Sequence, residues 1–143
     1  MEKILVSKCL LGEACRYDGK SVPCDAVIAL KERFILIPVC PEQLGGLPTP
    51  RIPAEIIGER VCRADSVDVT EEYIRGACES LKIALDNGCR IAVLKSRSPS
   101  CGKGSVYDGS FTCTLTVGDG ICAKLLKDHG IKIYDESETD DIK

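Results

Sequence analysis

The sequence of 143 residues contains one histidine, no tryptophan and no excess of positive charge. With His129 as its only histidine, the chain cannot form the histidine-rich sites of many zinc proteins. It has 19 Lys and Arg residues and 22 Asp and Glu residues, which give a formal net charge of −3. Because general nucleic-acid binders are usually strongly basic, we expect no nucleic-acid partner.

Long hydrophobic runs are also missing. The first apolar run ends at Ser7-Lys8 and is too short for the apolar region of a signal peptide or for a membrane span. We therefore expect a cytoplasmic protein that does not contact a membrane. Its length and its mixture of 44% hydrophobic and 29% charged residues predict one globular domain over residues 1–143.

Cysteine, in contrast, occurs ten times, which is several times its ordinary usage. Structural disulfides are rare in a reducing cytoplasm, and a chain of this length does not need them to fold. The ten cysteines must therefore be divided among buried packing, metal binding and catalysis.

Four short apolar runs predict β-strands. They cover Lys3–Val6, Phe34–Val39, Ile91–Leu94 and Ile131–Tyr134, and such near-continuous runs are typical of parallel strands covered on both faces.

Helical patterns lie between these runs. We expect helices over Asp25–Arg33, from an N-cap at Thr70 to a stop at Gly88, and over Gly120–His129. The predicted buried stripe of the second helix consists of Ile74, Ala77, Cys78, Leu81, Ala84 and Leu85. The alternation of strands and helices predicts an α/β fold, in which an open parallel sheet has helices on both faces.

Three segments have no clear strand or helix pattern. Leu44–Pro53 is rich in Gly and Pro and is interpreted as a loop that belongs to a site. Ser96–Gly120 is irregular, with a possible hairpin around Phe111–Val117, and the acidic segment Asp135–Lys143 is predicted to fray.

Position along the chain separates the cysteines into two groups. Cys9, Cys40 and Cys101 each follow a predicted strand, so the loops at the carboxyl ends of a parallel sheet would bring them together. Cys15 could join them from the first loop. The other six are interpreted as small buried or half-buried side chains: Cys24, Cys62, Cys78, Cys89, Cys113 and Cys122.

Three converging thiolates without histidine suggest a soft-metal site, either zinc or an iron–sulfur cluster. Three ligands would leave an open position, which favours chemistry over a purely structural site. The spacing matches neither paired C-x-x-C motifs nor ferredoxin runs, so a thiol-based catalytic pocket and unconnected cysteines remain alternatives.

Polar residues near these cysteines are candidates for chemistry. Glu42 follows Cys40 by two positions and can act as a general acid or base, or as an ordinary residue at a helix start. Ser98 and Ser100 can relay a proton or bind substrate, or can make turn hydrogen bonds. Arg51 can contact an anion or carbonyl, or lie on the surface.

Three long motifs resemble the bacterial DUF523 family, which includes the thiouracil desulfidases. They are V-S-K-C-L-L-G-E-A-C-R-Y-D-G, C-P-E-Q-L-G-G-L-P-T-P-R-I-P-A-E-I and L-K-S-R-S-P-S-C-G-K-G-S-V-Y-D-G. The resemblance extends over nearly the whole chain and includes G-D-G-I-C-A-K-L-L-K-D-H-G-I.

The resemblance implies a three-layer αβα domain with a Rossmann-like, mostly parallel sheet. It implies a 4Fe-4S cluster held by Cys9, Cys40 and Cys101, with one iron open to the sulfur of a small thiolated base. Cys15 is within the motif and could replace Cys9 as a ligand. The implied reaction converts thiouracil to uracil and sulfide without net redox change.

In that reaction Glu42 and Ser98 would be the acid–base pair. Arg51 and Ser100, from the analysis of the residues themselves, are the candidates to contact the substrate. The competing hypotheses are a zinc or iron–sulfur module without catalysis, and a metal-free persulfide sulfurtransferase that uses Cys101.

Overall fold

The central sheet contains four parallel strands. The structure is a computed structural model that describes residues 1–142. The strands are β1 (Lys3–Ser7), β2 (Ile35–Val39), β5 (Ile91–Leu94) and β8 (Lys132–Asp135), in the spatial order β2-β1-β5-β8. All four predicted strands and their parallel arrangement are therefore confirmed.

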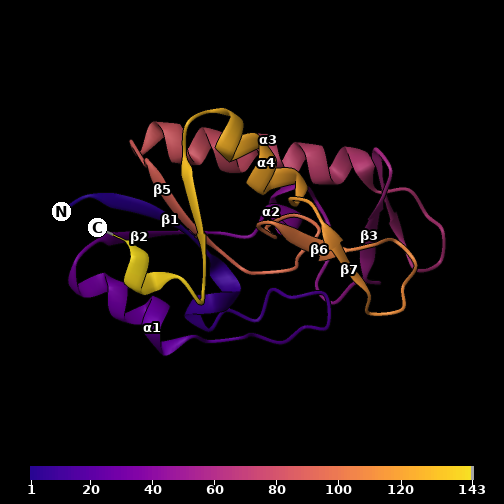
Figure 1. The fold of residues 1–143 in the computed structure, drawn as a ribbon, viewed down its shortest axis with the longest axis horizontal. Coiled ribbons are helices and arrows are strands. Elements are labelled where there is room, and N and C mark those ends of the chain that lie inside the picture. Colours follow the sequence, from indigo (N-terminus) through magenta and orange to yellow (C-terminus); the bar gives the residue numbers. More distant parts are fainter. Residues whose placement is uncertain (143) are drawn as a thin grey trace.

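Helices cover both faces of this sheet (Figure 1). On one face, α3 (Thr70–Asp86) and α4 (Ile121–Asp128) pack with Leu5 of β1 in one hydrophobic cluster. On the other face, α1 (Asp25–Ile28) and the 3₁₀ helix Ala29–Glu32 pack with the neighbouring strand residues in a second cluster. Successive β1 side chains point to opposite faces, so the three-layer αβα prediction is confirmed.

Two antiparallel hairpins lie beyond the carboxyl ends of the sheet strands (Figure 1). One consists of β3 (Ala54–Ile57) and β4 (Arg60–Arg63), which the sequence pattern did not predict. The other consists of β6 (Ser105–Tyr107) and β7 (Leu115–Val117). This hairpin begins earlier in the chain than the predicted Phe111–Val117 hairpin, and Phe111 lies in the loop that connects β6 and β7. The short α2 (Pro41–Leu44) directly follows β2.

The buried face of α3 differs from the predicted stripe. Ile74 and Leu85 are 50% and 57% exposed, whereas Tyr73, Gly76 and Ser80 are buried. The reason is close packing against α2, since a Cβ on Gly76 would lie 1.8 Å from the Pro41 carbonyl oxygen. Only a glycine allows this approach. The contact with α2 therefore turns the face of α3 that contains Gly76 toward the core and leaves Ile74 and Leu85 exposed.

The start of α3 also differs from the prediction. Thr70 is its first residue and not its N-cap, and the Thr70 amide donates to the carboxylate of Asp68 at 2.9 Å. The hydroxyl of Thr70 instead accepts a hydrogen bond from the Val61 amide at 2.8 Å and so connects α3 to β4.

Three further predictions are wrong. Cys78 and Cys113 are exposed and do not pack in the core, because Cys78 lies on the outer side of α3 and Cys113 lies in the β6–β7 loop. The acidic C-terminal segment is ordered as far as Ile142, which is 3% exposed within the second cluster and accepts a hydrogen bond from Arg33. Lys143 lies outside the described residues.

No helix within residues 1–142 combines the length and the apolar character required to cross a membrane.

Candidate active site

A pocket of about 510 Å³ lies at the carboxyl ends of β1, β2 and β5, with both hairpins contributing to its wall. It brings together every site residue predicted from the sequence. The lining includes Cys9, Cys40, Cys101, Glu42, Ser98, Ser100 and Arg51. Cys15 lines the same pocket, whereas His129 is exposed at the end of α4 and bonds the Leu125 carbonyl group.

The topology places the thiols. Cys9 lies in a 3₁₀ helix, Lys8–Leu11, immediately after β1, and Cys40 is the N-cap of α2 immediately after β2. Cys101 lies in the loop after β5, where the Cys122 amide in the first turn of α4 donates to the Ser100 carbonyl oxygen at 2.8 Å. Three parallel strands therefore deliver three cysteines to one edge of the sheet.

The buried thiols interact with one another. Cys15 forms hydrogen bonds with Cys40 and Cys9; the first lowers the pKa of Cys15, but the second and burial raise it to about 11. The bond with Cys15, together with burial, raises the pKa of Cys40, and burial raises the pKa of Cys101. Because the pKa values of Cys15, Cys40 and Cys101 are raised, these three thiols are protonated at neutral pH without a metal, and metal binding to them must release protons.

This donor set fits an iron–sulfur cluster. The thiols provide soft sulfur donors, the preferred ligands of such clusters. Within residues 1–142, no three His, Cys, Asp or Glu side chains are close enough together to hold a single metal ion. A [4Fe–4S] cluster does not require that convergence, because each of its cysteine ligands binds a different iron. The cysteines from the three strand ends therefore supply the kind of donor that such a cluster uses.

Beside the thiols, Glu42 is the centre of a hydrogen-bonded chain. The Nε of Arg51 donates to its Oε1 at 2.9 Å, and the hydroxyl of Ser100 donates to its Oε2 at 3.0 Å. The hydroxyls of Ser98 and Ser100 are 2.9 Å apart. A proton can therefore pass between Glu42 and Ser98 through Ser100 without a change in the backbone.

Arg51 is a clamp within the protein. Its Nη1 donates to the Pro48 carbonyl group and the Thr49 hydroxyl, and its Nη2 donates to the Cys15 carbonyl group at 2.9 Å. Burial lowers the pKa of Arg51, but the charge and hydrogen bond of Glu42 outweigh burial and raise it. The guanidinium thus connects the carboxylate to the cysteine loop.

Ser98 also shapes its own turn. Its hydroxyl oxygen accepts hydrogen bonds from the backbone amides of Ser100 and Cys101, each at 3.1 Å. The turn interpretation of the S-P-S segment is therefore correct, and the same turn places Ser98 and Cys101 in the pocket.

Sequence reasoning missed other residues of the pocket, among them Tyr73, Glu55, Tyr107 and Phe111. Tyr73 is hydrogen-bonded to Glu42, and burial raises the pKa of its hydroxyl group. Its spacing from Ala77, Ser80 and Ala84 matches one helix face, which could have identified it. Glu55, Tyr107 and Phe111 depend on the two hairpins, of which the sequence predicted only the second, and that one with a shifted position.

The sequence profile of the family described as 2-thiouracil desulfurase matches residues 4–138. The chain belongs to this family. The predicted resemblance to this family is thereby confirmed. The matched residues include the sheet strands and the segments that line the pocket.

Two relatives support the family assignment. The solved structure of the [4Fe-4S]-dependent thiouracil desulfidase TudS (DUF523Vcz) is 44% identical, covers 99% of this chain and 95% of its own, and has a TM-score of 0.93. The protein YbbK of Bacillus subtilis (strain 168), which is described as uncharacterised, is 40% identical over 149 residues. That alignment covers 97% of this family member and 99% of YbbK.

Proposed function

We propose that this protein is a 4Fe-4S-dependent desulfidase that converts a thiolated pyrimidine such as thiouracil to uracil and sulfide. Family membership and the 44% identity to a [4Fe-4S]-dependent thiouracil desulfidase support this activity. The single observation in this chain that carries it is one pocket lined by cysteines from three strand ends and by the bonded pair Glu42 and Ser100.

The proposed cluster ligands are Cys9, Cys40 and Cys101, with one iron left open. When bound, such a cluster would supply a Lewis acid for the sulfur of the substrate. Cys15 is the alternative to Cys9, because it is also buried and is hydrogen-bonded to two of the proposed ligands.

The proposed acid–base residues are Glu42 and Ser98. Glu42 takes a proton from the water whose oxygen bonds to the thiocarbonyl carbon, and Arg51 and Ser100 hold its two oxygens in place. Ser98 exchanges a proton with Glu42 through Ser100 as the carbon–sulfur bond breaks. Water supplies the carbonyl oxygen that replaces the sulfur, sulfur leaves as sulfide, and no electrons are gained or lost.

The proposed substrate is a small molecule held in this pocket. Arg51 and Ser100 line the pocket and are the residues proposed to contact the substrate. We further propose that the chain acts as one domain in the cytoplasm, without nucleic acid or a membrane as partner.

The metal-free sulfurtransferase hypothesis requires a reactive Cys101 thiolate. Burial raises the pKa of Cys101, whereas nucleophilic cysteines generally have a lowered pKa. A free Cys101 nucleophile is therefore disfavoured by the burial of its side chain.

The deciding experiment is sulfide release from a panel of thiolated bases and nucleosides by anaerobically reconstituted protein. Brown protein that releases sulfide and uracil from 2-thiouracil would support the proposal. Colourless protein with stoichiometric zinc would support a metal-binding module, and active metal-free protein would support a sulfurtransferase. Brown protein that releases no sulfide from any member of the panel would contradict the desulfidase activity.

A further inference from the structure

Glu55 is a buried acidic residue for which the proposed reaction has no role. It lies on β3, is 9% exposed and lines the same pocket as the cysteines. Its Oε1 accepts hydrogen bonds from the backbone amides of Gly109 at 2.9 Å and Phe111 at 3.2 Å. No Lys or Arg within residues 1–142 forms a salt bridge with it. These two amides therefore offset much of the cost of burying this carboxylate.

The loop that Glu55 binds connects β6 and β7. Phe111 has a φ of +58°, a conformation that is unfavourable for a bulky side chain. Gly109 has a φ of +92° and packs directly on β3, since a Cβ there would be 2.8 Å from the Ile56 carbonyl oxygen. The loop thus depends on contacts with β3. The Glu55 side chain provides two of them, through the backbone amides of Gly109 and Phe111, which lie on either side of Ser110 in the chain.

This loop contributes to an aromatic wall. The chain has only four tyrosines and two phenylalanines, and four of these six rings line the pocket. They are Tyr17, Tyr73, Tyr107 and Phe111. Aromatic side chains bind planar heterocycles by stacking, so this concentration of rings suits a flat substrate.

We infer that Glu55 is a positioning residue that fixes the β6–β7 loop and holds Phe111 as a specificity-determining wall for a planar heteroaromatic ring. The inference rests on the proposed function and extends it to recognition of the substrate ring. Glu55 acts by accepting hydrogen bonds from two backbone amides. Its role therefore requires an acceptor oxygen and not a negative charge.

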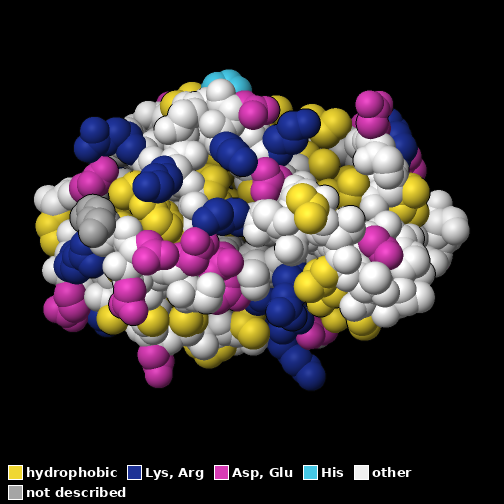
Figure 2. Space-filling model, in the orientation of Figure 1, with side chains coloured by type: hydrophobic (Ala, Val, Ile, Leu, Met, Phe, Trp, Pro, Cys, Tyr) yellow, Lys and Arg dark blue, Asp and Glu magenta, His cyan; other side chains and the backbone are white. Residues whose placement is uncertain are grey.

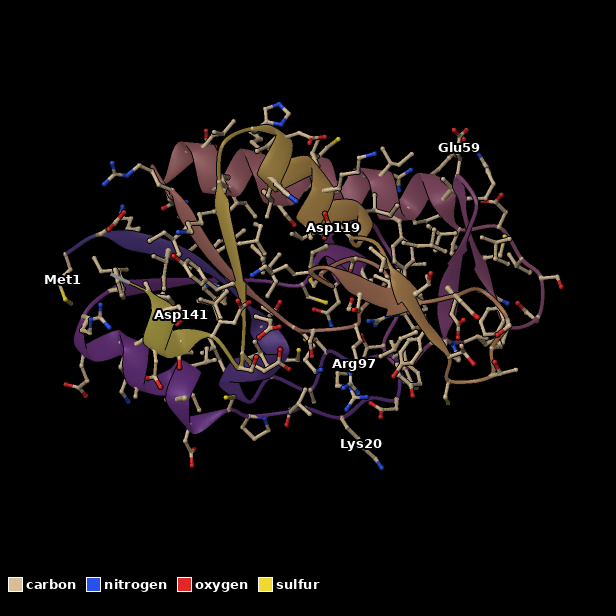
Figure 3. All side chains as sticks on the ribbon, viewed as in Figure 1. Met1, Lys20, Glu59, Arg97, Asp119 and Asp141 are labelled. Atoms are coloured by element: carbon tan, nitrogen blue, oxygen red, sulfur yellow. The ribbon has the colours of Figure 1, made fainter. Side chains whose placement is uncertain are left out.

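The charge-independent role makes a sharp comparison possible. Glu55→Ala removes the acceptor, Glu55→Gln keeps an acceptor oxygen without the charge, and Glu59→Gln is a control on the β3–β4 turn. Glu59 is exposed and points outward at the end of this hairpin (Figure 3). Hydrogen exchange of the Gly109 and Phe111 amides and the KM and kcat for 2-thiouracil are measured in holoenzymes with equal iron content.

In Glu55→Ala we expect exchange of both amides to accelerate at least about tenfold and KM to rise about tenfold, with kcat changed less than about twofold. Glu55→Gln should restore most of both effects, and Glu59→Gln should match the parent. Unchanged exchange in Glu55→Ala, or a loss of kcat at constant KM, would overturn the inference.

If Glu55→Ala fails to fold, Phe111→Ala tests the aromatic wall directly. We expect a KM about tenfold higher for 2-thiouracil with hydrogen exchange in the sheet unchanged, and unchanged KM would overturn the inference.

Absence of turnover in the parent holoenzyme would instead count against the proposed function. In that case amide exchange in Glu55→Ala and Glu55→Gln still tests the anchoring, and titration of the parent and Phe111→Ala with 2-thiouracil tests the wall. Equal affinity, or no detectable binding by the parent, would overturn the role of the wall in recognition.

Discussion

Arg51 and Glu42 form a buried ion pair at the edge of the pocket, with 2.9 Å between Nε and Oε1. Their side chains are 6% and 13% exposed, so water screens the pair much less than a surface salt bridge. Other basic side chains gather near the boundary between the sheet and the hairpins, around Arg97 (Figures 2 and 3). The Arg51–Glu42 pair lies deeper and fixes the proposed general base.

Replacing Arg51 by Met should destabilise the protein, because it leaves the Glu42 carboxylate buried without its cation. Breaking a buried pair in this way costs about 3–5 kcal/mol, and we expect a loss in that range. Urea unfolding of metal-free protein measures it. Glu42→Gln in the Arg51→Met background should recover part of the loss, and additive effects in this double-mutant cycle would contradict the coupling.

Glu42→Gln should reduce turnover of 2-thiouracil by at least about 10²-fold, because the amide cannot take a proton from water. The cluster content should stay at the parental level, since Glu42 is not a proposed ligand. Iron analysis and sulfide release measure the two effects, with the exposed Glu59→Gln as the control. Near-normal turnover with a full cluster would remove Glu42 from the mechanism.

Cys9→Ser, Cys40→Ser and Cys101→Ser should each lose most of the visible absorption after anaerobic reconstitution, because each removes one proposed ligand. The controls are Cys89→Ser, which alters a buried cysteine that does not line the pocket, and the exposed Cys78→Ser. Both should keep the absorption. Cys15→Ser decides whether Cys9 or Cys15 is the third ligand beside Cys40 and Cys101. Loss of the cluster in Cys15→Ser together with its retention in Cys9→Ser would make Cys15 the ligand in place of Cys9.

Gly76→Ala should destabilise the protein by about 1–3 kcal/mol through overpacking, because the added methyl group collides with the Pro41 backbone. The collision also moves the segment that carries Cys40 and Glu42, so turnover should fall with stability. Glu79→Ala places the same methyl group at an exposed position of α3 and should be neutral. Equal urea midpoints for the two variants would contradict the proposed packing.

Cys78 and Cys113 should be the first cysteines to react with iodoacetamide in the folded protein. They are the two exposed thiols among the ten cysteines, all of which lie within the described residues, and buried thiols react only after local opening. Peptide mass spectrometry after brief labelling measures the order of reaction. Faster labelling of the buried Cys122 or Cys89 would show that α4 or the start of β5 opens readily.

Local sequence patterns determined the central sheet and the position of the site. Runs such as Ile91–Leu94 are apolar enough to specify buried strands by themselves. Because parallel strands place their carboxyl ends at one edge, the convergence of Cys9, Cys40 and Cys101 also followed from the order of the elements. The long motifs identified the family before any contact was known.

The tertiary structure decided the features that depend on contacts between distant segments. The helix face of α3 is set by Gly76 against Pro41, a backbone contact that hydrophobic periodicity does not report. The Arg51 clamp and the Glu55 anchor join residues whose partners lie in other loops, for which no local pattern exists. The sequence by itself therefore determined which strands form and where their cysteines meet. Only packing in three dimensions decided which polar groups hold Glu42 and which aromatic rings line the pocket.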